Sequence, residues 1–109
     1  MFGFEKLEVW QKTKDFVNEI YKVTSNFLNN EQFGLTTHIR KSAVSILSNI
    51  AEGTSRFSND DFKRFLQIAL GSLYETVTQL FIAYDNNYLD KGIFDKLYEK
   101  SEIIYPEGS

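Results

Sequence analysis

The strongest constraint on the fold of this chain is a helical repeat of apolar residues that no proline interrupts. The only proline, Pro106, lies close to the end of the 109 residues. A proline inside a helix removes a backbone hydrogen bond and clashes with the preceding turn. Because the apolar residues recur at steps of three and four, the sequence predicts amphipathic helices and no strand.

The repeat divides into four segments with short connections, which favour antiparallel neighbours. We expect helices from about Glu5 to Leu28, from about Leu35 to Ala51, from Ser58 or Asn59 to about Tyr84, and a shorter one before Pro106. The turns are expected near Asn30, from Gly53 to Ser58 and from Asn86 to Asp90. The predicted fold class is all-α: an antiparallel up-and-down four-helix bundle with a short fourth helix, formed by residues 1–109 as a single domain.

The same spacing predicts which side of each later helix is buried. The expected core residues are Leu35, Ile39, Ala43, Ile46, Leu47 and Ile50 in the second helix, Phe62, Phe65, Leu66, Ala69, Leu70, Leu73, Val77 and Leu80 in the third, and Ile93, Leu97 and Ile104 in the fourth.

The stretch "SNIAEGTSRF", residues 48–57, interrupts the repeat between the second and third helices. Gly53 suits the position just after a helix, which commonly adopts the left-handed conformation. Ser58 or Asn59 can cap the third helix, and Asp60 and Asp61 complement the dipole of its first turn. Glu52, at the end of the second helix, is expected to pair with Arg56 or with an arginine of a neighbouring subunit.

Composition excludes several classes of function. The chain has no Cys, so a disulfide framework and a thiolate metal site are ruled out. Its start carries acids where a secretory signal has an apolar run, and its longest apolar stretch, Leu80 to Tyr84, is too short to cross a membrane. We therefore expect a soluble, cytoplasmic protein that is not bound to a membrane.

Catalytic and metal-binding chemistry has little support in the sequence. His38 is the only histidine, and no Glu-x-x-His pair of the di-iron type occurs. The adjacent Asp60 and Asp61 point about 100° apart on a helix and are explained by capping. We expect no catalytic residue, no metal and no cofactor.

Two helices carry a second polar or mixed stripe that a lone bundle does not need. On the third helix the stripe contains Arg64, Ile68, Gly71, Glu75, Thr78 and Ile82, and on the second it contains His38, Ser42, Ser45 and Asn49. Both are expected to serve self-association, although scattered apolar surface residues are common in monomers. Arg40 lies within the apolar arc of the second helix, and we expect it to pair with Glu75, within one chain or between chains.

The segments "GLTTHIRKSAVSILSNIAEGTSR" and "FKRFLQIALGSLYET", preceded by "FEKLEVWQKTKDFVNEIYKVTSNF", cover nearly the whole chain. They resemble the four-helix bundle proteins first noticed as products of intervening sequences inside bacterial 23S rRNA genes. The resemblance implies an up-and-down bundle that assembles into a homo-oligomer, often a pentamer around an axial channel. A related branch includes the accessory variability determinant of diversity-generating retroelements, a nucleic-acid-binding partner of a reverse transcriptase. This chain differs in its acidic charge and in ending soon after "IIYP", where a typical fourth helix continues.

Charge is unevenly distributed along the chain, whose formal net charge is -3. From His38 to Arg64 there are 5 basic residues (Arg40, Lys41, Arg56, Lys63 and Arg64) and 3 acids (Glu52, Asp60 and Asp61), which gives +2 locally and leaves -5 elsewhere. An oligomer would repeat this excess, so Lys41, Arg56, Phe57, Lys63 and Arg64 are candidates for contacts with RNA or DNA. The alternative is that Arg56 and Lys63 balance nearby carboxylates and Phe57 packs on the helix start. Two hypotheses therefore stay open: a nucleic-acid-binding scaffold, and a structural or adaptor protein that binds another protein.

Overall fold

The computed structural model describes residues 1–27 and 32–104, and within these ranges it contains helices and no strand. In chain order the elements are a 3-10 turn η1 (Gly3–Lys6), α1 (Glu8–Thr24), a π-helical turn η3 (Gln32–Thr36), α2 (Thr37–Thr54), α3 (Asn59–Asp85) and α4 (Lys91–Ile104). The predicted all-α fold is confirmed. The turn predicted near Asn30 and the ends predicted at Leu28 and before Pro106 lie outside the described residues.

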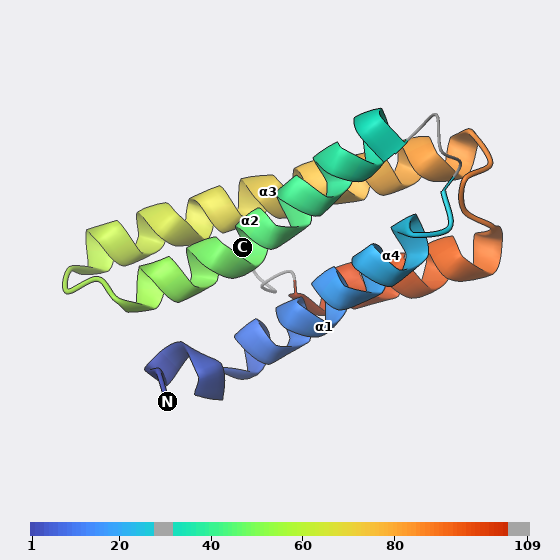
Figure 1. Ribbon diagram of the computed structural model, residues 1–109. Coiled ribbons are helices and arrows are strands. Elements are labelled where there is room, and N and C mark those ends of the chain that lie inside the picture. The colour runs from blue at the N-terminus through green and yellow to red at the C-terminus, as the bar shows by residue number, and fades with distance from the viewer. Residues whose placement is uncertain (28–31, 105–109) are drawn as a thin grey trace.

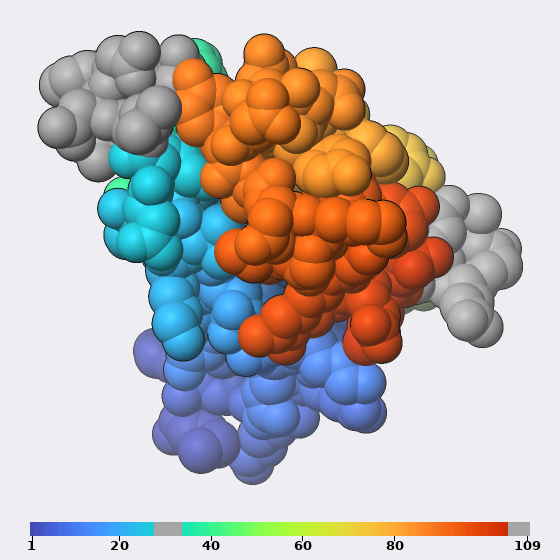
Figure 2. All heavy atoms as spheres, turned by 90° about the vertical axis from the view of Figure 1, so that its right-hand side faces the viewer, coloured from blue at the N-terminus to red at the C-terminus, as the bar shows by residue number. Residues whose placement is uncertain are grey.

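The helices form two antiparallel pairs that pack on each other (Figure 1). α2 and α3 make one hairpin, and α1 lies beside α4. Figure 2 looks onto the end where α3 turns into α4, and the orange atoms of this turn lie close to the cyan end of α1. The rings of Phe27 and Tyr88 meet there, with centroids 5.4 Å apart. This end of the bundle is closed.

The core lies between the two pairs and is apolar. Its most deeply buried large side chains are Phe16, Ile20, Ile39, Ile46, Leu80 and Leu97. The core face predicted for α2 is confirmed, since Ile39, Ala43, Ile46 and Ile50 are buried. Leu35 and Leu47 pack against the core while partly buried. Apolar spacing is thus a sufficient guide to the inner face of this helix.

The first predicted helix is shorter than expected and is divided in two. Leu7 has an extended backbone, with φ -75° and ψ 127°, so it separates η1 from α1. At the other end, the hydroxyls of Thr24 and Ser25 donate to the carbonyls of Ile20 and Tyr21 at 2.7 and 2.8 Å. Side chains that bond to the last carbonyls in this way compete with a further helical turn.

The register of the fourth helix also differs from expectation. Phe94, Leu97, Ser101 and Ile104 are buried in α4, whereas Ile93, which the sequence placed in the core, is exposed. Phe94 is buried in place of Ile93 because its ring stacks on that of Tyr84 in α3, with centroids 4.9 Å apart. Aromatic packing against α3 therefore fixes the rotation of α4.

Gly53 does not end α2, which was the role predicted for it. It is buried inside the helix, which continues to Thr54. A Cβ built at Gly53 would lie 3.2 Å from Cβ of Phe65 and 3.4 Å from Cδ1 of Phe62. The glycine is required by the close approach of α3 and not by a left-handed backbone.

Candidate functional site

The tip of the α2–α3 hairpin gathers most of the predicted nucleic-acid residues. The turn is short because side chains close both helix ends. The hydroxyls of Thr54 and Ser55 donate to the carbonyls of Ala51 and Glu52, each at 2.7 Å. Ser58 caps α3 as predicted, since its Oγ accepts from the backbone N–H of Asp61 at 3.1 Å. These bonds satisfy groups that a helix end leaves unpaired.

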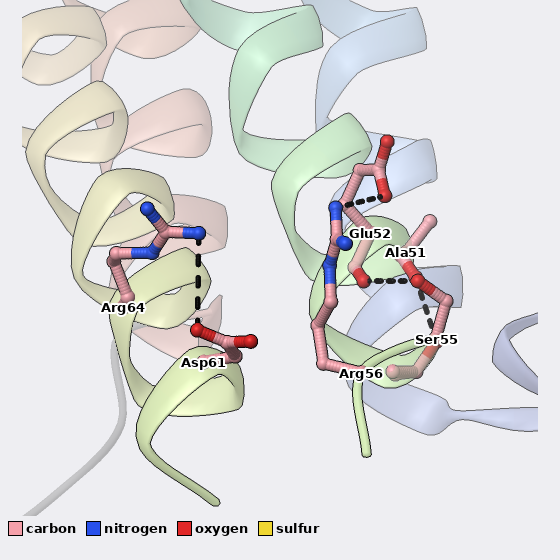
Figure 3. A network of polar contacts seen from close by, with 7 residues as sticks. Ala51, Glu52, Ser55, Arg56, Asp61 and Arg64 are labelled. Carbon is pink, nitrogen blue, oxygen red and sulfur yellow. Dashed lines mark hydrogen bonds and ion pairs between the residues drawn. The ribbon is translucent and has the colours of Figure 1, made fainter. Parts of the chain in front are cut away.

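Two arginines of this tip lie against one aromatic ring. The guanidinium carbons of Arg56 and Arg64 are 4.5 and 5.2 Å from the centroid of the Phe65 ring. Figure 3 shows that both also face carboxylates: Arg56 pairs with Glu52 at 3.2 Å and Arg64 with Asp61 at 3.9 Å. The predicted pair of Glu52 and Arg56 is confirmed. Each positive charge thus has a negative neighbour, which lowers the potential available to a polyanion.

Phe65 was assigned to the core from its spacing, and its place between two arginines was missed. The signal in the sequence was its position next to Arg64, but the approach of Arg56 depends on how the hairpin closes. Gly53 permits α3 to lie close to α2 at this point, because the Cβ of Phe65 packs where a side chain on Gly53 would stand.

The other predicted nucleic-acid residues differ in their surroundings. Phe57 is fully exposed, so it does not pack on the start of α3 as the alternative interpretation required. Lys63 is exposed and makes no ion pair with a described residue. Lys41 is also exposed, but it stands 15 residues before Arg56, which is about 22 Å along a helix. The structure therefore brings together Arg56, Phe57, Lys63 and Arg64 and leaves Lys41 apart.

The second stripe of α3 lies on the surface, as the sequence predicted. Ile68 and Ile82 are 46% and 49% exposed. Arg64, Gly71, Glu75 and Thr78 are exposed beside them. This set of six residues, called here the outer α3 face, is directed away from the core.

The stripe predicted for self-association on α2 is partly covered by α3, although His38 at its start is exposed. Ser42 is buried, and its Oγ donates to Oε1 of Gln79 at 2.9 Å. The hydroxyls of Ser45 and Ser72 lie 2.8 Å apart, and Nδ2 of Asn49 donates to the Ser45 carbonyl at 2.8 Å. Ser42 and Ser45 thus line the seam between α2 and α3 of the same chain. Small polar side chains allow another helix to pack closely, and in this chain that helix is α3.

Arg40 does not pair with Glu75 within the chain. Its Nε donates to Oγ1 of Thr24 at 2.8 Å and its Nη2 to the carbonyl of Tyr21 at 3.1 Å. The guanidinium also lies over the Tyr21 ring, 4.6 Å from the centroid. The partner is the carboxyl end of α1, where a positive charge complements the helix dipole.

Neither a metal centre nor a membrane span emerges from the described part of the chain. No group of three or more His, Cys, Asp or Glu side chains in residues 1–27 and 32–104 has the geometry to hold a metal ion. Among the same residues, every helix is too short or too polar to cross a bilayer.

Fold and surface together define the class: an up-and-down four-helix bundle with an apolar core, a polar seam between α2 and α3, and a charged hairpin tip. The sequence model of the 23S rRNA-intervening sequence proteins matches residues 5–106. The chain belongs to that family.

A solved structure supports the same assignment. It is the crystal structure of a protein of unknown function from the S23 ribosomal protein family of Bacteroides thetaiotaomicron VPI-5482. The two chains are 28% identical and superpose with a TM-score of 0.79, over 88% of this chain and 90% of the other. A search of curated proteins found no match. These comparisons establish family and fold, and the family's relation to the retroelement branch stays a prediction.

Proposed function

We propose that the protein is a non-enzymatic cytoplasmic scaffold that assembles with copies of itself through the outer α3 face. The observation that carries the proposal is the exposure of Ile68 and Ile82 on the side of α3 opposite the core. The core of the bundle gains nothing from these side chains, and burying them against another copy removes apolar surface from water.

The shape of the outer α3 face suits a close helix contact. Gly71 stands between the two isoleucines in sequence, and a Cβ built on it would meet nothing within 4 Å. A helix of another copy can therefore approach the backbone at this point. The number of subunits is proposed from the family resemblance, which implies a pentamer. Ser42 and Ser45 bond to α3 of the same chain, so we propose that the outer α3 face carries the contact between copies.

Light scattering at tens of micromolar protein tests the proposal. We expect a homo-oligomer, and we expect Ile68→Glu to dissociate it by placing a charge in the contact. Asn18→Glu is the control, because it adds the same charge at an exposed position on α1. A monomeric wild-type protein, or an assembly that Ile68→Glu leaves unchanged, would remove this face from consideration.

The hairpin tip favours a second candidate function, binding of RNA or DNA without sequence specificity. Its support is the fully exposed ring of Phe57 beside Arg56, together with the charge of Lys63, which makes no ion pair with a residue in 1–27 or 32–104. An exposed ring can stack on a base, and cations can contact phosphates. The pairing of Arg56 and Arg64 with carboxylates limits the net positive charge, so an oligomer that repeats the tip would be needed.

Titration with structured and single-stranded RNA at several salt concentrations tests the second candidate. Affinity should fall steeply as salt rises, and Arg56→Ala with Lys63→Ala should reduce the slope of log K against log salt by about 2. Lys22→Ala with Lys14→Ala is a charge-matched control on α1. Absence of binding at about 50 mM salt would leave the adaptor role, binding to another protein, as the remaining alternative.

A further inference from the structure

The hairpin tip carries one aromatic ring that no described part of the chain covers. Phe57 lies in the short link between α2 and α3 and is fully exposed. Backbone bonds hold the link at both ends. The N–H of Arg56 donates to the Gly53 carbonyl at 3.2 Å, and the N–H of Phe62 donates to the Ser58 carbonyl at 3.1 Å. The ring therefore stands on a fixed backbone, and burying it costs little further ordering of the chain.

A pocket of about 650 Å³ opens beside the same tip. One wall comes from the start of the chain, with Phe2 and Phe4, and the other from the end of α2, with Ala51, Glu52 and Ser55. Figure 3 shows the three α2 residues close to Arg56. The rings of Phe2 and Phe4 are stacked, with centroids 5.7 Å apart, and Phe2 is 71% exposed. A third aromatic ring in the pocket can continue this stack.

The charge in the pocket is opposite to the charge beside the exposed ring. Glu52 alone is charged among the described residues that line the pocket, and Nη2 of Arg56 lies 3.2 Å from its Oε2. Arg56 directly precedes Phe57, so a Phe57 ring that enters another copy brings an arginine to the Glu52 of that copy. Both charged side chains are exposed, where an ion pair contributes little. Exchanging the pair within a chain for a pair between copies therefore costs little.

The tip as a whole is balanced in charge. Residues 52–64 contain 3 basic and 3 acidic side chains, so their formal charge is zero: Arg56, Lys63, Arg64, Glu52, Asp60 and Asp61. A balanced surface does not repel an identical surface, and it gives a polyanion little net attraction. Among occupants of the pocket, these charges favour a second copy of the chain.

We propose that Phe57 of one copy enters the tip pocket of a second copy. Ser55 lines the pocket and Phe57 stands two residues later, so the ring and the pocket belong to the same end of the molecule. A two-fold arrangement then lets each copy give one ring and receive one. Such a contact is small, so it is weak and reversible in isolation. It does not use the outer α3 face, and either contact can be wrong without the other.

Sedimentation velocity on Ile68→Glu, which disables the outer α3 face, measures the tip contact by itself. We expect a monomer–dimer equilibrium at hundreds of micromolar protein. Adding Phe57→Ala should raise the dissociation constant by at least about 10-fold, because the central aromatic ring of a small contact carries most of its affinity. Ile103→Ala is the control, since it shortens an exposed apolar side chain that does not line this pocket.

Mixing two variants separates a ring-to-pocket contact from stacking of two Phe57 rings on each other. Ser48→Glu places a charge in the pocket at an exposed position, so it should fold normally. On the Ile68→Glu background, the Phe57→Ala variant keeps only the pocket and the Ser48→Glu variant keeps only the ring. Each alone should stay monomeric, and an equimolar mixture should associate. Asn18→Glu, which adds the same charge on α1, should leave the dimer intact.

Three results would overturn the proposal. The first is an Ile68→Glu protein that stays monomeric at all concentrations. The second is an association that Phe57→Ala leaves unchanged, including the case in which Phe57→Ala weakens RNA binding and the ring serves nucleic acid. The third is a mixture of the two variants that fails to associate, which would mean that the rings meet each other and the pocket has no part in the contact.

Discussion

Arg40 illustrates how one residue can connect two helices. It lies on α2, half buried, and its donors are directed at the last turn of α1. The α1 dipole places negative charge at that turn. The guanidinium complements it because its charge is permanent, and its diverging N–H groups reach both Thr24 and Tyr21.

We predict that Arg40→Met lowers the free energy of unfolding by about 1.5–3 kcal/mol, the usual range for hydrogen bonds to a charged group. Methionine keeps the apolar stem and removes the donors to Thr24 and Tyr21. Urea unfolding provides the measurement. Lys41→Met, a neighbouring exposed position, should change stability by less than about 0.5 kcal/mol. Glu75→Gln should also be neutral, and a large loss there would indicate that Glu75 pairs with Arg40 of another chain.

Gly53 and Gly71 make a matched pair of helical glycines with opposite surroundings. A side chain on Gly53 would press on Phe65 and Phe62, whereas one on Gly71 would point into open space. We predict that Gly53→Val destabilises the fold by about 1–3 kcal/mol through overpacking. Gly71→Val should not lower the thermal stability of the isolated bundle. Equal effects of the two substitutions would indicate that backbone conformation, and not the approach of α3, requires Gly53.

At the scale of elements, hydroxyl contacts between side chains lie in the seam between α2 and α3. Oγ1 of Thr76 donates to Oγ of Ser42 at 2.8 Å, and both side chains are buried. Such a bond is directional, so it favours one register of the two helices over neighbouring ones.

Thr76→Val should therefore cost about 1–2 kcal/mol of stability, since the shape is kept while a buried hydrogen bond is lost. Thr78→Val is the control, because Thr78 is exposed and its Oγ1 donates to the Tyr74 carbonyl four residues earlier. Chemical denaturation of both variants gives the comparison. A neutral Thr76→Val would show that packing alone fixes the seam.

The α1–α4 contact has an electrostatic part whose pH dependence can be worked out. The hydrogen bond with Asp15 raises the pKa of Lys100 above its ordinary value of 10.5. A pKa raised on folding adds stability that is complete below the unfolded value and is lost as pH rises through the folded one. Lys100→Met should thus cost about 0.5–1 kcal/mol, constant between about pH 6 and pH 9 and shrinking as pH rises from 10.5 through the raised pKa. Thermal unfolding against pH tests this; a cost that vanished by about pH 8 would contradict it.

Some features of these elements could be predicted from the sequence, and others depend on how the helices pack. The helices and the inner face of α2 could be predicted, because apolar spacing determines burial once helices pack. The partner of Arg40 could not, since Thr24 and Tyr21 come close only when α1 and α2 are docked. Ser42 and Ser45 suit a contact within the chain as well as one between chains, and spacing alone does not distinguish the two. Phe62 and Leu66, which the sequence placed in the core, are 37% and 39% exposed, and spacing alone does not show this.

At the scale of the whole molecule, Gly71 connects the stability of the bundle to its proposed assembly. In an exposed helix interior, alanine is favoured over glycine by about 1 kcal/mol, and a Cβ at this position meets nothing within 4 Å in the single chain. If another copy packs on the outer α3 face, the same Cβ enters the contact at its closest point.

Gly71→Ala should therefore act in opposite directions on the two properties. We predict that it stabilises the bundle by about 0.5–1 kcal/mol and weakens self-association. Unfolding at low concentration and light scattering at tens of micromolar measure the two effects separately. Thr78→Ala on the same face removes bulk and should weaken association less. An assembly as strong as the wild type in Gly71→Ala would mean that helices do not approach closely at this glycine, and the contact would have to centre on Ile82 or on another surface.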